Sequence, residues 1–296
     1  MKTIYHKQER ETKHARKSLG QNFLINKNKI GEIVSALELK DGDTVVEIGP
    51  GHGELTKELR IRNKELRIIA IEKDENLARN LENEIGDEKT KIVEGDGLKI
   101  LPSIIHNPLF KIQKYKLVGN IPYYITGFLL RILGELELKP ERIVLTVQKE
   151  VAERICGGMN PVRNLARAAC APEGPAGRAI SNGMNLLAAS VQFWARPEIV
   201  GFIPKRDFSP EPKVDSAIIR LMTKDFRPMT NDTENYYKLI KILFKQPRKT
   251  ILNNLLSGYA VPKKELVQKI ESAGAAPNKR PQNLNPKDII NMSRLF

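Results

Sequence analysis

Between residues 26 and 222, short β-rich runs alternate with amphipathic helical patterns, and this order constrains the fold more than any other feature. The strand candidates are TVVEIG (44–49), RIIAIE (67–72), KIVEGD (91–96), KLVGNI (116–121), RIVLTV (142–147), a run near 189–194, and SAIIRL (216–221). Between most of them lie stretches such as GELTKELRIR and ENLARNLENEIG, in which apolar residues recur at spacings of three and four. Such alternation favours an α/β fold with a mostly parallel sheet and helices on both faces.

The last strand and the C-terminal quarter of the chain depart from this alternation. SAIIRL follows FSPEPKVD, a proline-interrupted stretch with no room for a crossover helix, so we expect this strand to run antiparallel to its neighbour. From about residue 225 the strand patterns stop, and helical patterns follow in ENYYKLIKILFK, RKTILNNLL, KKELVQKIESAG and NPKDIINMSRLF. We therefore predict an α/β domain over residues 21–224 and a small all-helical domain over residues 225–296.

Two segments carry no periodic pattern. Residues 1–20 are polar and basic, and we interpret them as a mobile arm. Residues 157–183 are rich in Ala, Gly, Pro and Arg, and the tripeptide Gly-Met-Asn occurs at both ends of this stretch, at 158–160 and 183–185. We interpret the stretch as an insertion into a surface loop, where extra length costs little stability. An RNA-contacting loop is the alternative, because it contains Arg163, Arg167 and Arg178.

The charge of the chain points to a polyanionic partner. The 49 Lys and Arg residues against 35 Asp and Glu give a formal net charge of +14. RNA, DNA or an anionic membrane face are the partners that such an excess favours, and a merely basic surface is the alternative. The predicted helical domain has its own group of cations, which we expect to contact RNA: Lys238, Lys241, Lys245, Arg248 and Lys249.

Several classes of protein are disfavoured by composition. No run approaches the roughly 18–20 uncharged apolar residues that span a bilayer, and the first residues lack the apolar centre of a secretory signal. The two cysteines, Cys156 and Cys170, cannot form a disulfide framework, and no Cys/His cluster has the spacing of zinc ligands. We therefore expect a cytoplasmic protein that has no membrane segment and no metal.

A glycine-rich turn follows the first strand candidate. In VVEIGPGHGELT, Gly49, Gly51 and Gly53 stand between a strand and a helix, where a tight turn and a closely approaching ligand exclude larger residues. The spacing G-x-G-x-G differs from the G-x-G-x-x-G of dinucleotide sites, and no Lys-Ser/Thr follows as in a P-loop. Glu47 just before the turn is also a poor neighbour for a pyrophosphate, so a ligand without phosphates is favoured.

The next two strand candidates each end in an acid. A carboxylate at Glu72 can accept hydrogen bonds from both hydroxyls of a ribose, and Asp96 can accept from the exocyclic amine of adenine. The alternative is that Glu72 and Asp96 only cap the helices that follow them. A glycine turn, a ribose acid and an adenine acid on three successive strand ends indicate a nucleoside cofactor, and S-adenosylmethionine fits this set.

The fourth strand candidate ends in Asn120-Ile121-Pro122-Tyr123-Tyr124, which suits methyl transfer to an adenine amine. That nitrogen must rehybridise and gain positive charge as it attacks a methyl group. The Asn120 amide oxygen and the carbonyl of residue 121 or 122, in a turn fixed by Pro122, can accept its two hydrogens and stabilise the charge. An aromatic ring beside them can stack the base. A turn with buried tyrosines is the alternative.

Several motifs occur together in the order of a known family: GQNFL (20–24), VEIGPGHGELT, IEKD (71–74), EGDGL (94–98), NIPYY (120–124), VQKEVAERI (147–155), DFSPEPKVDSAIIRL (207–221) and FKQPRKTILNNL (244–255). The chain resembles the ribosomal RNA adenine N6,N6-dimethyltransferases from about residue 15 to its end, except over 157–183. The resemblance implies a Rossmann-like class I S-adenosylmethionine-dependent methyltransferase sheet over residues 21–224 and an RNA-binding helical domain over residues 225–296. The target base would be swung out of its stack.

The resemblance also implies roles for individual residues. Gln21, Asn22 and Leu24 would contact the methionine end of the cofactor, with Gly49, Gly51 and Gly53 in the glycine turn, Glu72 at the ribose and Asp96 at the adenine. Asn120 would hold the target amine beside the cofactor, with Pro122 in the same turn. Tyr123 would stack the target base, and Phe208 would form a second aromatic wall.

Within the family, the motifs resemble the branch that modifies two adjacent adenosines near the 3′ end of small-subunit rRNA. The expected partner is that rRNA or a pre-assembled small ribosomal subunit, and we expect a monomer. Ile121 is more common in the large-subunit antibiotic-resistance branch, so a large-subunit rRNA adenine methylase is one alternative. A non-catalytic nucleic-acid-binding assembly factor on the same fold is another.

Overall fold

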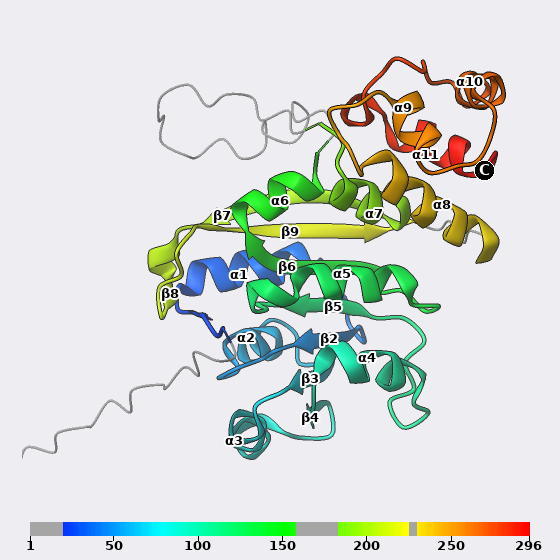
Figure 1. Ribbon diagram of the computed structural model, residues 1–296. Helices are drawn as coiled ribbons and strands as arrows, with labels where there is room; N and C mark the ends of the chain where they lie inside the picture. The colour runs from blue at the N-terminus through cyan, green and yellow to red at the C-terminus, as the bar shows by residue number, and fades with distance from the viewer. Residues whose placement is uncertain (1–19, 158–182, 225–229) are drawn as a thin grey trace, which may run out of the picture.

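The structure is a computed structural model that describes residues 20–157, 183–224 and 230–296. Its centre is a seven-stranded sheet with the order β4-β3-β2-β5-β6-β9-β7 (Figure 1). The strands are β2 (Thr44–Ile48), β3 (Arg67–Glu72), β4 (Thr90–Glu94), β5 (Lys116–Gly119), β6 (Arg142–Gln148), β7 (Ala195–Ile203) and β9 (Ser216–Thr223). Strands β4, β3, β2, β5 and β6 are parallel, and β9 runs antiparallel to both β6 and β7. The predicted mostly parallel sheet and its antiparallel last strand are confirmed.

Helices cover both faces of the sheet. They are α1 (Lys27–Ala36), α2 (Glu54–Arg62), α3 (Glu75–Ile85), α4 (Gly97–His106), α5 (Thr126–Glu135), α6 (Lys149–Ile155) and α7 (Leu186–Trp194). Successive strand residues point to opposite faces, so Val45 packs in the cluster that holds Ile33 of α1, whereas Val46 packs with Leu129 of α5. None of the helices in the described ranges is long and apolar enough to cross a membrane.

The strand predicted near 189–194 is wrong. Residues Leu186–Trp194 form α7, and the strand β7 begins directly afterwards at Ala195. The helix has little amphipathic pattern because its side chains from Ala188 on are largely buried, so an apolar run there is compatible with either structure. Strand β7 contains Pro197 and Gly201, which disfavour a strand in general. Pro197 is tolerated because β7 is an edge strand, where one side of the backbone has no sheet partner.

The four C-terminal helical patterns are confirmed. They form α8 (Thr230–Leu243), α9 (Ile251–Leu256), α10 (Lys263–Ser272) and α11 (Pro286–Ser293), which lie together at one end of the molecule (Figure 1). This helical domain packs against α7: the ring of Tyr236 stacks on that of Phe193 at 4.0 Å between centroids, and its hydroxyl donates to the carbonyl of Ala189 at 2.9 Å. The helical domain and one face of the sheet therefore share a single apolar cluster.

Some interpretations of the sequence concern residues outside the described ranges. The predicted arm lies almost wholly within residues 1–19, and the predicted insertion lies almost wholly within 158–182. The predicted boundary near residue 225 falls in 225–229, which are also outside the description. These three interpretations, and the RNA-contacting alternative for the insertion, stay predictions.

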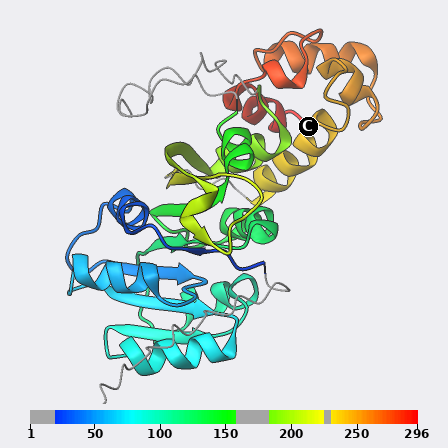
Figure 2. The same cartoon turned by 90° about the vertical axis from the view of Figure 1, so that its left-hand side faces the viewer.

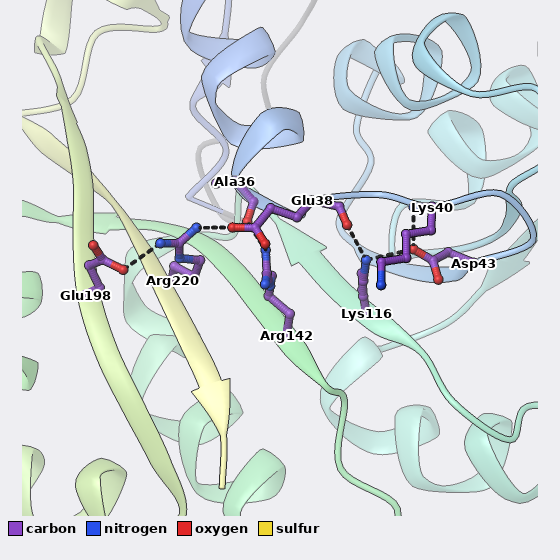
Figure 3. Close-up of polar contacts among 8 residues, drawn as sticks. All are labelled: Ala36, Glu38, Lys40, Asp43, Lys116, Arg142, Glu198 and Arg220. Atoms are coloured by element: carbon purple, nitrogen blue, oxygen red, sulfur yellow. Dashed lines mark hydrogen bonds and ion pairs between the residues drawn. The ribbon is translucent and has the colours of Figure 1, made fainter. Parts of the chain in front are cut away.

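A network of ion pairs fixes the segment between α1 and β2 to the sheet edge at which the parallel strands begin (Figure 3). The Glu38 carboxylate binds Arg142 of β6 at 2.7 Å and Arg220 of β9 at 2.9 Å. Lys116 of β5, which is almost buried, donates to the Glu38 carbonyl at 2.6 Å and to the Asp43 carboxylate at 2.7 Å. One short segment thereby holds three strands, and it leaves the opposite edge of the sheet for ligands.

Candidate active site

A cavity of about 320 Å³ lies at the carboxyl ends of β2, β3 and β5 and beside the start of α4. Figure 2 is turned toward the side of the molecule where these strands end, and the blue start of the described chain crosses it. The cavity is lined by eight of the nine predicted cofactor residues: Gln21, Asn22, Leu24, Gly49, Gly51, Glu72, Asp96 and Asn120. Pro122 also lines it. Five separate stretches of the sequence are thus brought to one cavity.

The glycine turn leaves space that larger residues would fill. Gly49 has φ of +69° and Gly51 has φ of +61°, a backbone conformation that residues with a Cβ rarely adopt. A Cβ on Gly49 would meet nothing within 4 Å, so the backbone there borders open space in a cavity wall. A Cβ on Gly51 would lie 2.9 Å from the Phe23 ring. The turn therefore allows close approach to its backbone at Gly49 and close packing at Gly51.

Gly53 does not line the cavity. It is the N-cap of α2 with φ of +82°, and a Cβ there would overlap the Leu81 side chain of α3. The structure therefore gives this glycine a packing role, which the motif spacing alone could not separate from a ligand contact.

Glu72 is 4% exposed at the end of β3, and both of its carboxylate oxygens are oriented by the backbone. One oxygen accepts from the Gly51 N–H at 2.9 Å and the other from the Asp74 N–H at 2.8 Å. Burial raises the pKa of Glu72, and the backbone hydrogen bonds oppose that shift. Asp74, not Glu72, caps α3, so the capping alternative for Glu72 is wrong.

Asp96 both caps a helix and faces the cavity. One of its oxygens accepts from the Leu98 N–H at the start of α4, at 3.1 Å, and the other accepts from the Lys73 ammonium at 2.9 Å. Burial acts to raise the pKa of Asp96, but the hydrogen bonds from Lys73 and the Leu98 N–H, together with the nearby lysine charges, outweigh it and the pKa is lowered. Lys73 also lines the cavity and was not predicted, because its position depends on how two loops meet.

Glu47 lies beneath the glycine turn and is fully buried, although it lines the cavity. One carboxyl oxygen accepts from the Thr56 hydroxyl at 2.7 Å, and the other has no hydrogen-bond partner among the described residues. Burial raises the pKa of Glu47 from its ordinary value of 4.5 to about 8. The carboxyl group is therefore mainly protonated at neutral pH in the folded protein.

We expect Glu47→Gln to become more stable relative to the parent as pH rises from 5 to 8. In this range the unfolded parent releases a proton at Glu47 that the folded parent keeps, so the free energy of unfolding of the parent falls as pH rises. The glutamine variant has no proton to release, and the difference between the two grows by up to about 1.4 kcal/mol per pH unit. Urea unfolding of both proteins at several pH values measures this, and a difference independent of pH would contradict the assignment.

The segment before α1 is held against Asn120. The Asn120 side-chain amide donates to the Asn22 carbonyl at 3.0 Å, and the Asn22 side chain donates to the Gly20 carbonyl at 3.3 Å. A carbonyl can only accept, so this bond places the Asn120 nitrogen toward Asn22. The Asn120 amide oxygen is then the end of that group that remains for a ligand in the cavity.

The two predicted aromatic walls do not line the cavity. The Tyr123 hydroxyl is hydrogen-bonded to the Ser216 hydroxyl at 2.6 Å, and burial raises the pKa of Tyr123. Phe208 is 3% exposed, in the short strand β8 (Phe208–Ser209), which pairs with β1 (Phe23–Leu24). The pairing places Phe208 opposite Leu24, which lines the cavity, although Phe208 itself does not. Their proposed contacts with a target base stay predictions.

Three aromatic residues that the sequence did not single out also line the cavity. Tyr124 and Phe128 are 59% and 61% exposed, and Phe23 is buried beneath the glycine turn. Tyr124 and Phe128 are four residues apart, the spacing that places two side chains on one face of a helix, and this spacing is the signal that could have indicated them.

The donor set of the cavity fits S-adenosylmethionine. Glu72 and Asp96 supply acceptors for hydroxyl and amine groups, and the glycine backbone at Gly49 borders open space. Lys73 is the one cation among the lining residues, and it is already paired with Asp96, so the cavity lacks the positive charge that a pyrophosphate needs. In the described ranges, no three His, Cys, Asp or Glu side chains are grouped so that they could hold a metal ion.

Comparisons with known proteins identify the family of the chain. The sequence model of the family described as ribosomal RNA adenine dimethylase matches residues 12–166 and 175–296. A protein of Dehalococcoides mccartyi strain CBDB1 named Ribosomal RNA small subunit methyltransferase A is 36% identical over 279 residues, 94% of this chain and 87% of the relative. A protein of the same name from Moorella thermoacetica is 34% identical over 287 residues, 94% of this chain and 91% of the relative.

Solved structures share the fold over most of the chain. A dimethyladenosine transferase from Plasmodium falciparum superposes with a TM-score of 0.68 at 25% identity, over 91% of this chain and 95% of that one. The 23S rRNA methyltransferase ErmE superposes with a TM-score of 0.66 at 24% identity, over 92% of this chain and 98% of that one. The family model and the relatives each cover most of the sequence, and the chain therefore belongs to the ribosomal RNA adenine dimethylase family.

Proposed function

We propose that this protein transfers methyl groups from S-adenosylmethionine to N6 of two adjacent adenosines near the 3′ end of small-subunit (16S) rRNA. Each adenosine receives two methyl groups and becomes N6,N6-dimethyladenosine, as a step of ribosome biogenesis. The observation that carries this proposal is the Asn120 amide, held by Asn22 at the wall of a cavity that also contains Glu72 and Asp96. The names of the relatives support the small subunit as the substrate.

Different lining residues would bind different parts of the cofactor. Glu72 would accept from the ribose hydroxyls of the cofactor, Asp96 from its adenine amine, and the segment Gln21, Asn22 and Leu24 would contact its methionine end. Gly49 would let the cofactor approach the backbone, and Gly51 would let Phe23 pack against the same turn. The cofactor supplies a methyl group on a positively charged sulfur, which is a good leaving group.

Asn120 would act on the other reactant, the target amine. Its amide oxygen accepts one N–H of the adenine amine, and a main-chain carbonyl of the 121–122 turn accepts the other. Both acceptors stabilise the positive charge that develops on nitrogen during transfer, and they are fixed in place beforehand. The nitrogen becomes acidic once it carries the new methyl group, so water can remove its proton and no strong general base is needed.

We propose that the protein works as a cytoplasmic monomer on small-subunit rRNA or on a pre-assembled small subunit. The relatives' name, Ribosomal RNA small subunit methyltransferase A, supports the choice of small-subunit rRNA. The alternative is a large-subunit methylase, whose substrate would be 23S rRNA. The likeness to ErmE, at 24% identity, shows a shared fold and does not favour that substrate. Incubating purified small and large subunits separately with the protein and tritiated S-adenosylmethionine tests this. Label in small-subunit rRNA supports the proposal, and label only in large-subunit rRNA overturns it.

We propose that the cations of the helical domain contact RNA phosphates. All five predicted residues are exposed in and after α8: Lys238, Lys241, Lys245, Arg248 and Lys249. The turn that carries the last three is rigid, because the buried Asn254 side chain donates to the carbonyls of Gln246 and Thr250 at 3.1 Å each. A rigid basic turn loses little conformational entropy when it binds a phosphate backbone.

We expect alanine at Lys245, Arg248 and Lys249 together to weaken RNA binding and flatten its salt dependence. Three lost phosphate contacts on single-stranded RNA lower the slope of log affinity against log salt by about 2, because each contact releases about 0.7 of a counterion. The measurement is fluorescence anisotropy of a small-subunit 3′-end RNA from low to moderate salt. A matched control removes three exposed lysines elsewhere, at Lys64, Lys91 and Lys114. Equal slopes in the two variants would contradict the assignment.

A further inference from the structure

A second groove, of about 440 Å³, lies outside the cofactor cavity and shares no lining residue with it. It is formed by the start of α6 and by the segment that joins β7 to β9, and its lining includes Lys149, Glu150, Glu153, Lys205, Lys213 and Asp215. Two motifs that have no part in the cofactor cavity meet here, VQKEVAERI (147–155) and the KVDS portion of 207–221. A role for these motifs is therefore to be sought in this groove.

The groove adjoins the tyrosine that is proposed to stack the target base. Asp215 lines the groove, and the next residue, Ser216, is hydrogen-bonded to the Tyr123 hydroxyl at 2.6 Å. Asp215 also joins the two walls: its carbonyl accepts from the Lys149 N–H at 3.0 Å, and its carboxylate accepts from the Lys205 N–H at 3.0 Å. The groove therefore lies one residue away from the partner of Tyr123.

The lysines of the groove present charge to solvent. Lys149 and Lys213 are exposed and form no ion pair within the part of the chain that is described. The Lys149 ammonium lies 5.3 Å from the centre of the Phe202 ring, which is 44% exposed. Lys205 pairs with Glu211 at 2.9 Å, but both side chains are about half exposed, and such pairs exchange readily for a phosphate.

The acidic residues of the groove distinguish its ligand from a simple polyanion. Glu150 and Glu153 can accept hydrogen bonds, and so can the side-chain amide oxygen of Gln148, which also lines the groove. An RNA backbone alternates phosphates, which need cations, with ribose 2′-hydroxyls, which donate hydrogen bonds. Cations interleaved with acceptors therefore suit a ribose–phosphate chain. The exposed face of Phe202 offers a surface on which a base can stack.

We propose that this groove binds the ribose–phosphate backbone of the rRNA strand next to the methylated adenosine, with Lys149 and Lys213 at its phosphates. This inference rests on the proposed function and adds a second RNA contact, on the α/β domain. Figure 1 shows β8, which belongs to the segment between β7 and β9, at the left of the molecule, well apart from α9–α11 at the upper right. An RNA held by both surfaces is fixed on two sides of the target site, which orients the base that enters it.

The test compares Lys149→Ala/Lys213→Ala with the control Lys64→Ala/Lys91→Ala. The control removes the same charge from two exposed positions away from the groove: Lys91 lies in the edge strand β4, and Lys64 lies in the loop before β3. Binding of a single-stranded RNA from the small-subunit 3′ end is measured with S-adenosylhomocysteine present, so that no turnover is needed. Loss of two phosphate contacts lowers the slope of log affinity against log salt by about 1.4. Over a fourfold rise in salt, the affinity of the groove variant should therefore fall about sevenfold less than that of the parent. We expect the groove variant to show this change and the control to match the parent.

Four further measurements separate the possible outcomes. S-adenosylmethionine affinity and thermal unfolding should be equal in the groove variant, the control and the parent, and KM for the RNA should rise in the groove variant alone. Equal salt slopes in variant and control overturn the groove, whatever the activity of the parent. An inactive parent whose RNA binding still depends on Lys149 and Lys213 contradicts the proposed function and leaves the groove supported. An RNA with 2′-deoxy nucleotides beside the target should bind the parent more weakly, and equal binding overturns recognition of the 2′-hydroxyls.

Discussion

Asn120→Ala is expected to lower the rate of methyl transfer to small-subunit rRNA by about 10²–10³-fold, the effect of removing one fixed group that stabilises charge in a transition state. The alanine side chain cannot accept from the target amine, so the nitrogen must develop positive charge with one acceptor fewer. It also loses the hydrogen bond to the Asn22 carbonyl, which holds the segment before α1 in place. The rate is measured as single-turnover transfer from labelled S-adenosylmethionine to pre-assembled small subunits.

The same variant should bind S-adenosylmethionine within about fivefold of the parent, since one neutral hydrogen bond contributes about 1 kcal/mol. This split between transfer and binding distinguishes a residue that acts on the target amine from one that only holds the cofactor. Asn80→Ala is a matched control, because Asn80 is an exposed asparagine in α3 that does not line the cavity. Transfer at the parental rate by Asn120→Ala would remove this residue from the mechanism.

Glu72→Gln is expected to weaken S-adenosylmethionine binding by about 10²-fold. Hydrogen bonds to a charged group contribute about 1.5–3 kcal/mol each, and the variant loses the charge that two ribose hydroxyls are proposed to meet. The substitution also disrupts the hydrogen bonds around the side chain, because both Glu72 oxygens accept from backbone N–H groups, those of Gly51 and Asp74. A glutamine must place its NH₂ against one of these donors.

Calorimetric titration with S-adenosylmethionine measures the affinity, and urea unfolding without cofactor measures the cost of the mismatched donors, which we expect to be about 1–3 kcal/mol. Glu75→Gln is the matched control: Glu75 stands three residues further on, is exposed, and pairs with the exposed Arg79 alone among the residues that the structure describes. A folded Glu72→Gln protein with parental affinity would show that the ribose is bound elsewhere.

The sequence placed Glu72, Asp96 and Asn120 at one cavity because each stands at the end of a hydrophobic run. Glu72 is the last residue of β3, Asp96 follows β4 and Asn120 follows β5, and parallel strands bring their carboxyl ends to one edge. The register of the sheet then determines how these residues lie relative to one another. The glycine turn at Gly49 was equally visible, because only glycine adopts its positive φ at low cost.

The sequence did not predict features that depend on contacts between distant segments. Lys73 reaches Asp96 across two loops, and Phe23 packs under Gly51, a contact that no local pattern encodes. Which of two adjacent tyrosines faces the cavity is decided by a single turn of 3₁₀ helix, Tyr123–Ile125, and it is Tyr124 that lines the cavity.

The misplaced strand has a similar origin. The stretch from Leu186 to Ile203 changes from helix to strand between Trp194 and Ala195 with no glycine, proline or polar turn to mark the change. The helix is determined by burial between the sheet and the helical domain, where Tyr236 packs on Phe193. Such tertiary burial overrides the local pattern of the sequence.

The most direct test of the account is mass spectrometry of the 3′-terminal fragment of small-subunit rRNA after pre-assembled small subunits are incubated with the protein and S-adenosylmethionine. The account predicts a fragment with two adjacent N6,N6-dimethyladenosines for the parent and an unmodified fragment for Asn120→Ala over the same time. An unmodified fragment with the parent protein, or equal modification by the two proteins, would contradict it.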